Sequence, residues 1–216
     1  MVAEPEVSDA RSVILDRIAS SLVDVAGAGT EPAPPAHERV KRDDLGSLFS
    51  DRVTDYRANV TRCSAAGVAD AVTAICERHS AHRLVTPAKL SHSWIPAGIE
   101  RIVDQPPLDV SGLDAVDGVI TGSAAAVAET GTVILDGGPE SGRRALSLVP
   151  DLHICVVRED DILPDVPEAL AAIKDAAASG QPITLISGPS ATSDIELERV
   201  EGVHGPRRLE VLLVAA

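Results

Sequence analysis

The stretch Asp117–Leu135, DGVITGSAAAVAETGTVIL, decides the fold class of this 216-residue chain. Apolar runs at Gly118–Ile120 and Val133–Leu135 are typical of buried strands, because each is short, continuous and bounded by glycine or threonine. Between them, Ser123–Ala128 is rich in alanine, the residue with the highest helix propensity, and predicts a helical segment. A strand, a helix and a second strand in this order indicate an α/β unit.

The same alternation continues to the C-terminus. Further buried strands are predicted at Leu152–Val157, Ile183–Ile186 and Leu209–Val214, with a helix at Pro167–Ala178 between the first two. Short apolar runs that alternate with helices favour parallel strands with helices on both faces. We therefore expect an α/β domain built on a mostly parallel sheet.

The N-terminal part has a different character. Ser8–Val25 predicts an amphipathic helix, and Gly27–Glu38 contains three prolines and two glycines, which are typical of an extended linker. A second helical pattern lies within Asp44–Ser64. We expect residues 1–38 to form an N-terminal helix and linker, and residues 39–216 to form the α/β domain.

Composition excludes several classes of protein. The formal net charge of −14 would repel a phosphate backbone, and very few aromatic residues are present to stack on bases, so nucleic-acid binding is not expected. No apolar run is long enough to span a membrane, and the N-terminus lacks the pattern of a signal peptide, so we expect a cytoplasmic protein. Cys63, Cys76 and Cys155 are far apart in sequence, which predicts neither a zinc site nor an iron–sulfur cluster in this chain.

Glu129 is the candidate catalytic residue. Its carboxylate lies in a turn of small residues, where it is suited to act as a nucleophile, a general base or an acceptor for a ligand hydroxyl. Thr130 and Gly131 complete this turn, and Ala128 and Gly131 leave room for a ligand. The alternative is a glutamate at a helix end that binds nearby backbone amides.

The stretch Ser187–Glu196, SGPSATSDIE, is a candidate anion site. It is expected to follow a strand and to open a helix capped by Ser193, so that Gly188, Ser190, Thr192 and backbone amides hold an anion at the helix N-terminus. The alternative is an ordinary strand-to-helix turn. Neither the Walker pattern nor GxGxxG is present, so a nucleotide is not specifically implied.

Two arginine pairs lie in glycine-rich loops of this acidic chain. The pairs Arg143–Arg144 and Arg207–Arg208 are candidates for bidentate binding of a carboxylate or phosphate, with solvated loop charges as the alternative for one member of each pair. Arg143 and Arg207 are the members chosen for the site. His204 is the better candidate for an acid–base or ligand-binding histidine, whereas His153 begins an apolar strand and is expected to be structural. We expect the turns at Thr130, Pro189 and Pro206 to meet at one edge of the sheet and form an anion-binding hollow.

Four stretches together resemble the LUD-domain family. They are Ala126–Leu135 (AVAETGTVIL), the run Gly142–Val157, Ser187–Glu196 (SGPSATSDIE) and Gly202–Val214 (GVHGPRRLEVLLV). The resemblance is strong over residues 110–216 and weaker over residues 8–110. Because four motifs occur in the right order, the likeness is more specific than any one motif.

The resemblance implies a fold like that of ribose-5-phosphate isomerase, glucosamine-6-phosphate deaminase and CoA transferases. It also implies a role in the oxidation of L-lactate to pyruvate together with iron–sulfur partner proteins, which carry the clusters. In CoA transferases of similar fold a catalytic glutamate lies in a Glu-x-Gly turn, and Glu129–Gly131 resembles that turn. The alternative function is therefore a stand-alone enzyme that binds a phosphorylated sugar or an acyl-CoA.

Overall fold

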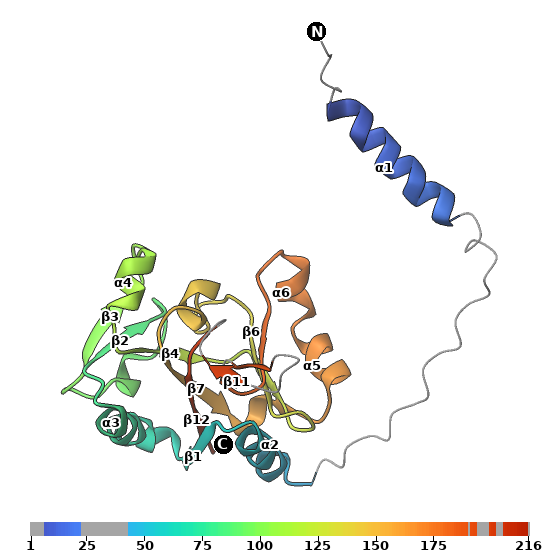
Figure 1. The fold of residues 1–216 in the computed structure, drawn as a ribbon. Coiled ribbons are helices and arrows are strands. Elements are labelled where there is room, and N and C mark those ends of the chain that lie inside the picture. The colour runs from blue at the N-terminus through green and yellow to red at the C-terminus, as the bar shows by residue number, and fades with distance from the viewer. Residues whose placement is uncertain (1–6, 23–42, 190, 194–198, 202–204, 216) are drawn as a thin grey trace. The chain divides into compact units, whose positions relative to one another are not determined.

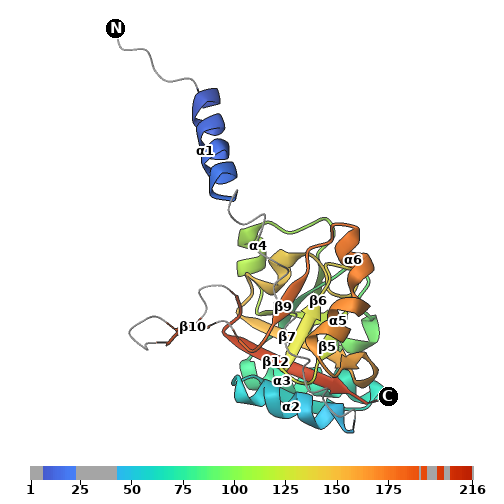
Figure 2. The same cartoon turned by 90° about the vertical axis from the view of Figure 1, so that its right-hand side faces the viewer.

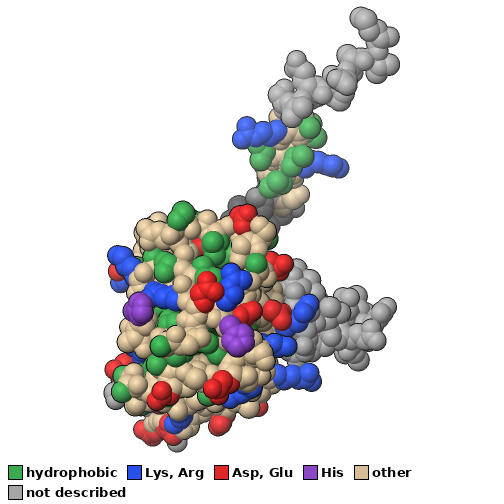
Figure 3. Space-filling model, turned by 90° about the vertical axis from the view of Figure 1, so that its left-hand side faces the viewer, with side chains coloured by type: hydrophobic (Ala, Val, Ile, Leu, Met, Phe, Trp, Pro, Cys, Tyr) green, Lys and Arg blue, Asp and Glu red, His purple; other side chains and the backbone are tan. Residues whose placement is uncertain are grey.

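The structure, a computed structural model, describes residues 7–22, 43–189, 191–193, 199–201 and 205–215. It divides into two units, residues 1–38 and residues 39–216. In the first unit, helix α1 (Val7–Leu22) carries large apolar side chains that are about half exposed, and Figure 3 shows hydrophobic side chains along it. Across the described ranges, no helix combines the length and the apolar character needed to cross a bilayer.

The described part of the second unit contains a six-stranded, all-parallel sheet (Figure 1). Strands β7 and β12 lie inside the sheet and pair over seven residues. Nearly all their side chains are buried, as is typical of strands with continuous apolar sequence. The expected α/β fold with a mostly parallel sheet is confirmed. In spatial order the strands are β1 (Asn59–Cys63), β12 (Arg208–Val214), β7 (Leu152–Arg158), β4 (Gly118–Gly122), β2 (Arg83–Thr86) and β3 (Glu100–Val103).

A second, four-stranded sheet packs against the first and was not expected from the sequence. Only β5 and β8 are parallel in it, and its other pairs are antiparallel. The helix expected at Ser123–Ala128 is wrong, because β5 occupies its centre with both faces of the strand buried, and this burial outweighs the helix propensity of alanine. The strand order is β8 (Ile162–Leu163), β5 (Ala125–Val127), β6 (Thr132–Leu135) and β9 (Thr184–Ile186).

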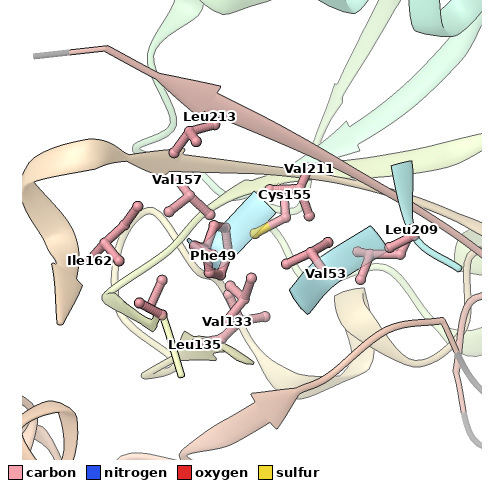
Figure 4. Packing of buried hydrophobic residues seen from close by; sticks show 13 residues of the cluster. Phe49, Val53, Val133, Leu135, Cys155, Val157, Ile162, Leu209, Val211 and Leu213 are labelled. Carbon is pink, nitrogen blue, oxygen red and sulfur yellow. The ribbon is translucent and has the colours of Figure 1, made fainter. Parts of the chain in front are cut away.

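The two faces of the large sheet bury different partners, as the period of two along a strand requires. Cys155 and Val157 of β7 point toward the small sheet, where Phe49 and Val53 of helix α2 (Leu45–Asp55) fill the space between the layers (Figure 4). The even-numbered residues of β7 pack instead on helix α3 (Val68–His79). The order of layers is therefore α3, large sheet, small sheet and α5, with α2 closing one side of the gap between the sheets (Figure 1). Figure 2 turns the molecule so that α5 and the small sheet face the viewer.

The remaining elements are short. Helix α5 (Val166–Ala172) is capped by Asp165, whose carboxylate accepts a hydrogen bond of 2.9 Å from the Glu168 N–H. It covers the outer face of the small sheet and leads into α6 (Lys174–Ala178). Helix α4 (Val110–Asp114) and the 3-10 turns η1 (Ala65–Gly67), η2 (His92–Trp94), η3 (Arg144–Ser147) and η4 (Glu159–Asp161) complete the connections.

Two further expectations need correction. The helical pattern within Asp44–Ser64 ends at Asp55, and its last part forms strand β1, which pairs with β12 at the sheet edge. The helix expected to start at Ser193 is also wrong at its start, because β10 (Ala191–Ser193) pairs with β11 (Arg199–Glu201) as an antiparallel ladder. Cross-strand partners satisfy backbone groups there that a helix would have bonded locally.

Helix α3 is fixed to the sheet by a buried carboxylate. The Glu210 side chain, 1% exposed, points from β12 toward this helix. It lies 2.6 Å from His79 Nε2 and accepts hydrogen bonds from Arg78 at 3.0 Å and from Asn59 at 2.9 Å. A buried carboxylate with this many partners is a structural anchor.

Candidate functional site

A hollow of about 270 Å³ opens at the amino ends of β7 and β12. Three segments form its wall: the 3-10 turn η3, residues 184–189 of β9 and its following turn, and residues 205–206 ahead of β12. Its lining mixes apolar side chains with a guanidinium, an imidazole and hydroxyls. Such a combination of apolar walls and a few convergent polar groups is typical of small-molecule sites.

His153 lies in this wall, on the face of β7 that points toward the small sheet. Its ring is 1% exposed, and its Nε2 lies 2.8 Å from the Thr121 hydroxyl on the adjacent strand β4. The same hydroxyl also donates to Cys155 Sγ at 3.7 Å. Burial lowers the pKa of His153 to about 4, so the ring is neutral at neutral pH. Its Nδ1 has no hydrogen-bond partner among the described residues.

Adjacent arginines have different surroundings. Arg144 lines the hollow, and its Nη1 donates to the Thr184 hydroxyl at 2.7 Å. Arg143, the residue expected to bind an anion, is held by the Asp104 carboxylate at 2.6 and 2.9 Å and donates to the Leu108 carbonyl. Arg143 lies instead beside a second hollow, where β2 and β3 end.

A row of hydroxyls connects the Thr130 turn with the rim of the hollow. Thr130 Oγ1 lies 2.7 Å from Thr132 Oγ1, which lies 2.7 Å from Ser187 Oγ. Ser187 and Gly188 both line the hollow. Gly188 has φ +90°, and a Cβ there would lie 2.6 Å from the Tyr56 Cβ, so the close approach of this turn to the end of α2 requires glycine.

Glu129 is partly buried beside the hollow's hydroxyl row, but it is not among the lining residues. Its backbone N–H donates to the Pro164 carbonyl at 3.1 Å. Gly131, at φ +62°, packs directly on helix α2, where a Cβ would lie 2.7 Å from the Arg52 carbonyl carbon. The glycine of this turn therefore serves close packing against α2.

The other expected site residues have these positions. Arg207 is exposed, with its Nε 3.7 Å from an Asp151 carboxylate oxygen, and Thr192 lies in β10 opposite Val200. Ser190 and His204 lie outside the described residues. The turns at Pro189 and Pro206 meet at the hollow, and the Thr130 turn reaches it through the hydroxyl row.

The sequence interpretation chose Arg143 from the pair Arg143–Arg144 and took His153 as structural, whereas the structure places Arg144 and His153 in the lining of the hollow. A histidine in an apolar strand reads as a core residue, and only its pairing with Thr121 on β4 shows that one ring nitrogen is used and the other left over. Within the described residues, no three His, Cys, Asp or Glu side chains gather as metal ligands would.

Comparison with known proteins places the chain in a family. The model of the LUD domain family matches residues 112–214. Lactate utilization protein C of Deinococcus radiodurans is 44% identical, over 99% of this chain and all of that protein. Lactate utilization protein C of Bacillus subtilis strain 168 is 28% identical, over 93% of this chain and 94% of that protein.

A solved structure also matches. The crystal structure of a DUF162 family protein from Deinococcus radiodurans is 41% identical, with a TM-score of 0.71, over 81% of this chain and 99% of that one. This match therefore combines likeness in fold with likeness in sequence. The chain belongs to the LUD-domain family, in the group of relatives that are named lactate utilization protein C.

Proposed function

We propose that this protein acts in lactate utilization, as a subunit or accessory protein of a system that oxidises L-lactate to pyruvate. The observation that carries the proposal is the 44% identity, over nearly the whole of both chains, with a relative named lactate utilization protein C. Identity at this level over full length, and not over one motif, supports a shared role.

In this proposal the redox centres belong to iron–sulfur partner proteins. Cys63, Cys76 and Cys155 lie in three different elements, β1, α3 and β7. Burial, with a smaller contribution from the Asp117 charge, raises the pKa of Cys76 to about 11, and burial raises that of Cys155 to about 12. Thiolate is the form that binds metal, so these surroundings disfavour a cluster on this chain.

The test is genetic. We expect a strain that lacks this gene, and that has no other lactate oxidase, to fail on L-lactate as sole carbon source and to grow normally on glucose. A plasmid copy of the gene restores growth on lactate. Normal growth of the deletion strain on lactate would refute the proposal. If a tagged chain purifies without any iron–sulfur protein, only the proposed partnership is refuted.

A second candidate function is a stand-alone enzyme for a phosphorylated sugar or an acyl-CoA, with Glu129 as its catalytic carboxylate. The observation in its favour is the hydroxyl row from Thr130 to Ser187, which joins the Glu129 turn to the hollow. A thermal-shift screen of sugar phosphates and CoA esters tests it. Stabilisation by a CoA ester that Glu129→Gln abolishes supports this function, and no response to any of these compounds counts against it.

A further inference from the structure

His153, which lines the hollow at the amino ends of β7 and β12, has a ring nitrogen with no partner among the described residues. His153 Nε2 and Cys155 Sγ both contact the Thr121 hydroxyl, which has one proton to give. Both bonds form together when Nε2 donates to the Thr121 oxygen and the Thr121 proton points to sulfur. Nδ1 of the neutral ring is then a bare acceptor, buried and without a partner among the described residues. Because buried polar groups are nearly always paired, this atom indicates a missing donor.

The same hollow contains a guanidinium that has no acidic partner in the described part of the chain. Arg144 donates to the Thr184 hydroxyl, and no carboxylate of the described residues lies within ion-pair distance of it. Its neighbour Arg143 shows the contrast, because Asp104 occupies two of its donors. A guanidinium presents its donors as a planar fork that matches a carboxylate, so Arg144 is placed to bind one.

The walls limit the class of anion. Leu148, Leu185, Ile186 and Leu209 surround the polar groups, together with the two prolines of the flanking turns. These apolar walls favour an organic anion over bare phosphate, because an organic anion has a hydrocarbon part that can pack against them. The ligand therefore needs a carboxylate, a short carbon body and one hydrogen-bond donor.

We propose that the hollow binds a small hydroxy acid, whose carboxylate pairs with the Arg144 guanidinium and whose hydroxyl donates a hydrogen bond to His153 Nδ1. The choice of L-lactate as the first probe rests on the proposed function in lactate utilization. The recognition chemistry rests on the hollow itself and applies to other hydroxy acids of similar size.

The first experiment needs no mutation. Calorimetric titration of the purified full chain compares L-lactate with propanoate, which lacks the hydroxyl, and with L-2-methoxypropanoate, which keeps the oxygen but has no proton to donate. We expect L-lactate to bind about fivefold more tightly than either, which corresponds to one hydrogen bond of about 1 kcal/mol. Equal binding of all three, or no binding of L-lactate and of larger hydroxy acids, overturns the proposal.

Variants then assign the two contacts. Arg144→Ala should weaken L-lactate and propanoate alike by at least about tenfold, and Arg144→Lys should fall between, because lysine keeps the charge and loses the fork. Lys174→Ala removes one positive charge from the exposed surface of α6 and is the matched control, expected to bind as the unmodified chain does. Unchanged binding by Arg144→Ala would refute the carboxylate contact.

His153→Gln retains an amide nitrogen near the Nε2 position, from which it can donate to Thr121, and removes the Nδ1 acceptor. We expect it to bind propanoate as the unmodified chain does and to lose the preference for L-lactate, a change of ratio that a merely structural role would not produce. Preference for L-lactate retained in a folded His153→Gln would refute the hydroxyl contact.

Inorganic phosphate is titrated in parallel, and phosphate binding without carboxylate binding would replace this proposal by a phosphate site. All these experiments measure binding directly, so their result is independent of the growth test. If L-lactate binds but the deletion strain grows normally on lactate, only the proposed function is overturned.

Discussion

Asp104 holds Arg143 with both carboxylate oxygens, at 2.6 Å from Nε and 2.9 Å from Nη2, and thereby joins the loop after β3 to the loop before η3. The Asp104 side chain is 5% exposed. Burial by itself would raise the pKa of Asp104, but hydrogen bonds from Arg143 and the Leu108 N–H, with the charge of Arg143, outweigh burial and hold this pKa below its ordinary value.

This pair gives a prediction for acid stability. Because the folded-state pKa of Asp104 is lowered, its stabilisation is fully present above about pH 4 and is lost as the pH falls through the lowered value. In urea titrations at neutral pH, Arg143→Ala should reduce the free energy of unfolding by about 1–3 kcal/mol, since it leaves a buried carboxylate unpaired. Asp104→Asn should show a weaker decline of stability below pH 4 than the unmodified chain.

The control for this prediction is an exposed ion pair of the same kind. Arg83 and Glu100 lie 3.3 Å apart with both side chains largely in solvent, so Glu100→Gln should change stability by less than about 1 kcal/mol. An equal effect of Arg143→Ala and Glu100→Gln would show that the Asp104 pair is not a special contact.

The buried His153 predicts a second pH dependence of stability, at higher pH than that of Asp104. The unfolded chain takes up a proton at this residue near pH 6.5, whereas the folded chain does so only near pH 4. Stability should therefore fall between these values as the pH is lowered, by up to about 3 kcal/mol from this group. His153→Gln should flatten the curve in that interval, and His82→Gln, at an exposed histidine, should not. A slope that both variants leave unchanged would contradict a neutral, buried His153.

Alanine substitutions at three glycines distinguish the cost of a positive φ from the cost of a steric clash. Gly188→Ala combines a positive φ with a Cβ 2.6 Å from Tyr56 and should destabilise the protein by about 1–3 kcal/mol. Gly180→Ala has a positive φ in open space and should cost about 1–2 kcal/mol. Gly98→Ala has neither problem and should stay within about 0.5 kcal/mol. Chemical denaturation orders the three, and a Gly188→Ala variant as stable as Gly98→Ala would refute the close approach to α2.

The boundary at residue 38 stays a prediction, and it has a direct test. Because the structure divides into residues 1–38 and 39–216, a chain that begins at Arg39 should retain the cooperative thermal transition of the full chain, with a midpoint within a few degrees. Circular dichroism measures both transitions. Loss of cooperativity in the shorter chain would show that the α/β domain requires the N-terminal segment.

The interior strands β7 and β12 of the large sheet could be predicted from the sequence, because they are continuous apolar runs, whereas the edge strand β1 was taken for part of a helix. Leu152–Val157 and Leu209–Val214 were predicted within one residue of the observed strands. The small sheet could not be predicted in the same way. Alanines at 125 and 126 favour a helix locally, and only the burial of both strand faces between β6 and β8 makes them a strand.

The site was harder to predict because its chemistry depends on which way neighbouring side chains face. Arg143 and Arg144 are adjacent in sequence, but the Asp104 carboxylate holds the first, whereas the second donates to the Thr184 hydroxyl and has no carboxylate partner among the described residues. His153 gains its significance from Thr121, which is distant in sequence and adjacent in the sheet. Such pairings follow from sheet register, which local patterns do not specify.

The hydroxyl row from Thr130 to Ser187 couples the hydrogen-bond directions at its two ends. Thr132 is buried, so its single proton must go to one of its two neighbours, and the whole row then points one way. When the row points toward Ser187, that serine offers its own proton to an occupant of the hollow; when it points away, the serine offers only a lone pair. An occupant that needs one or the other thereby sets the polarity of the Thr130 turn, without displacement of any heavy atom.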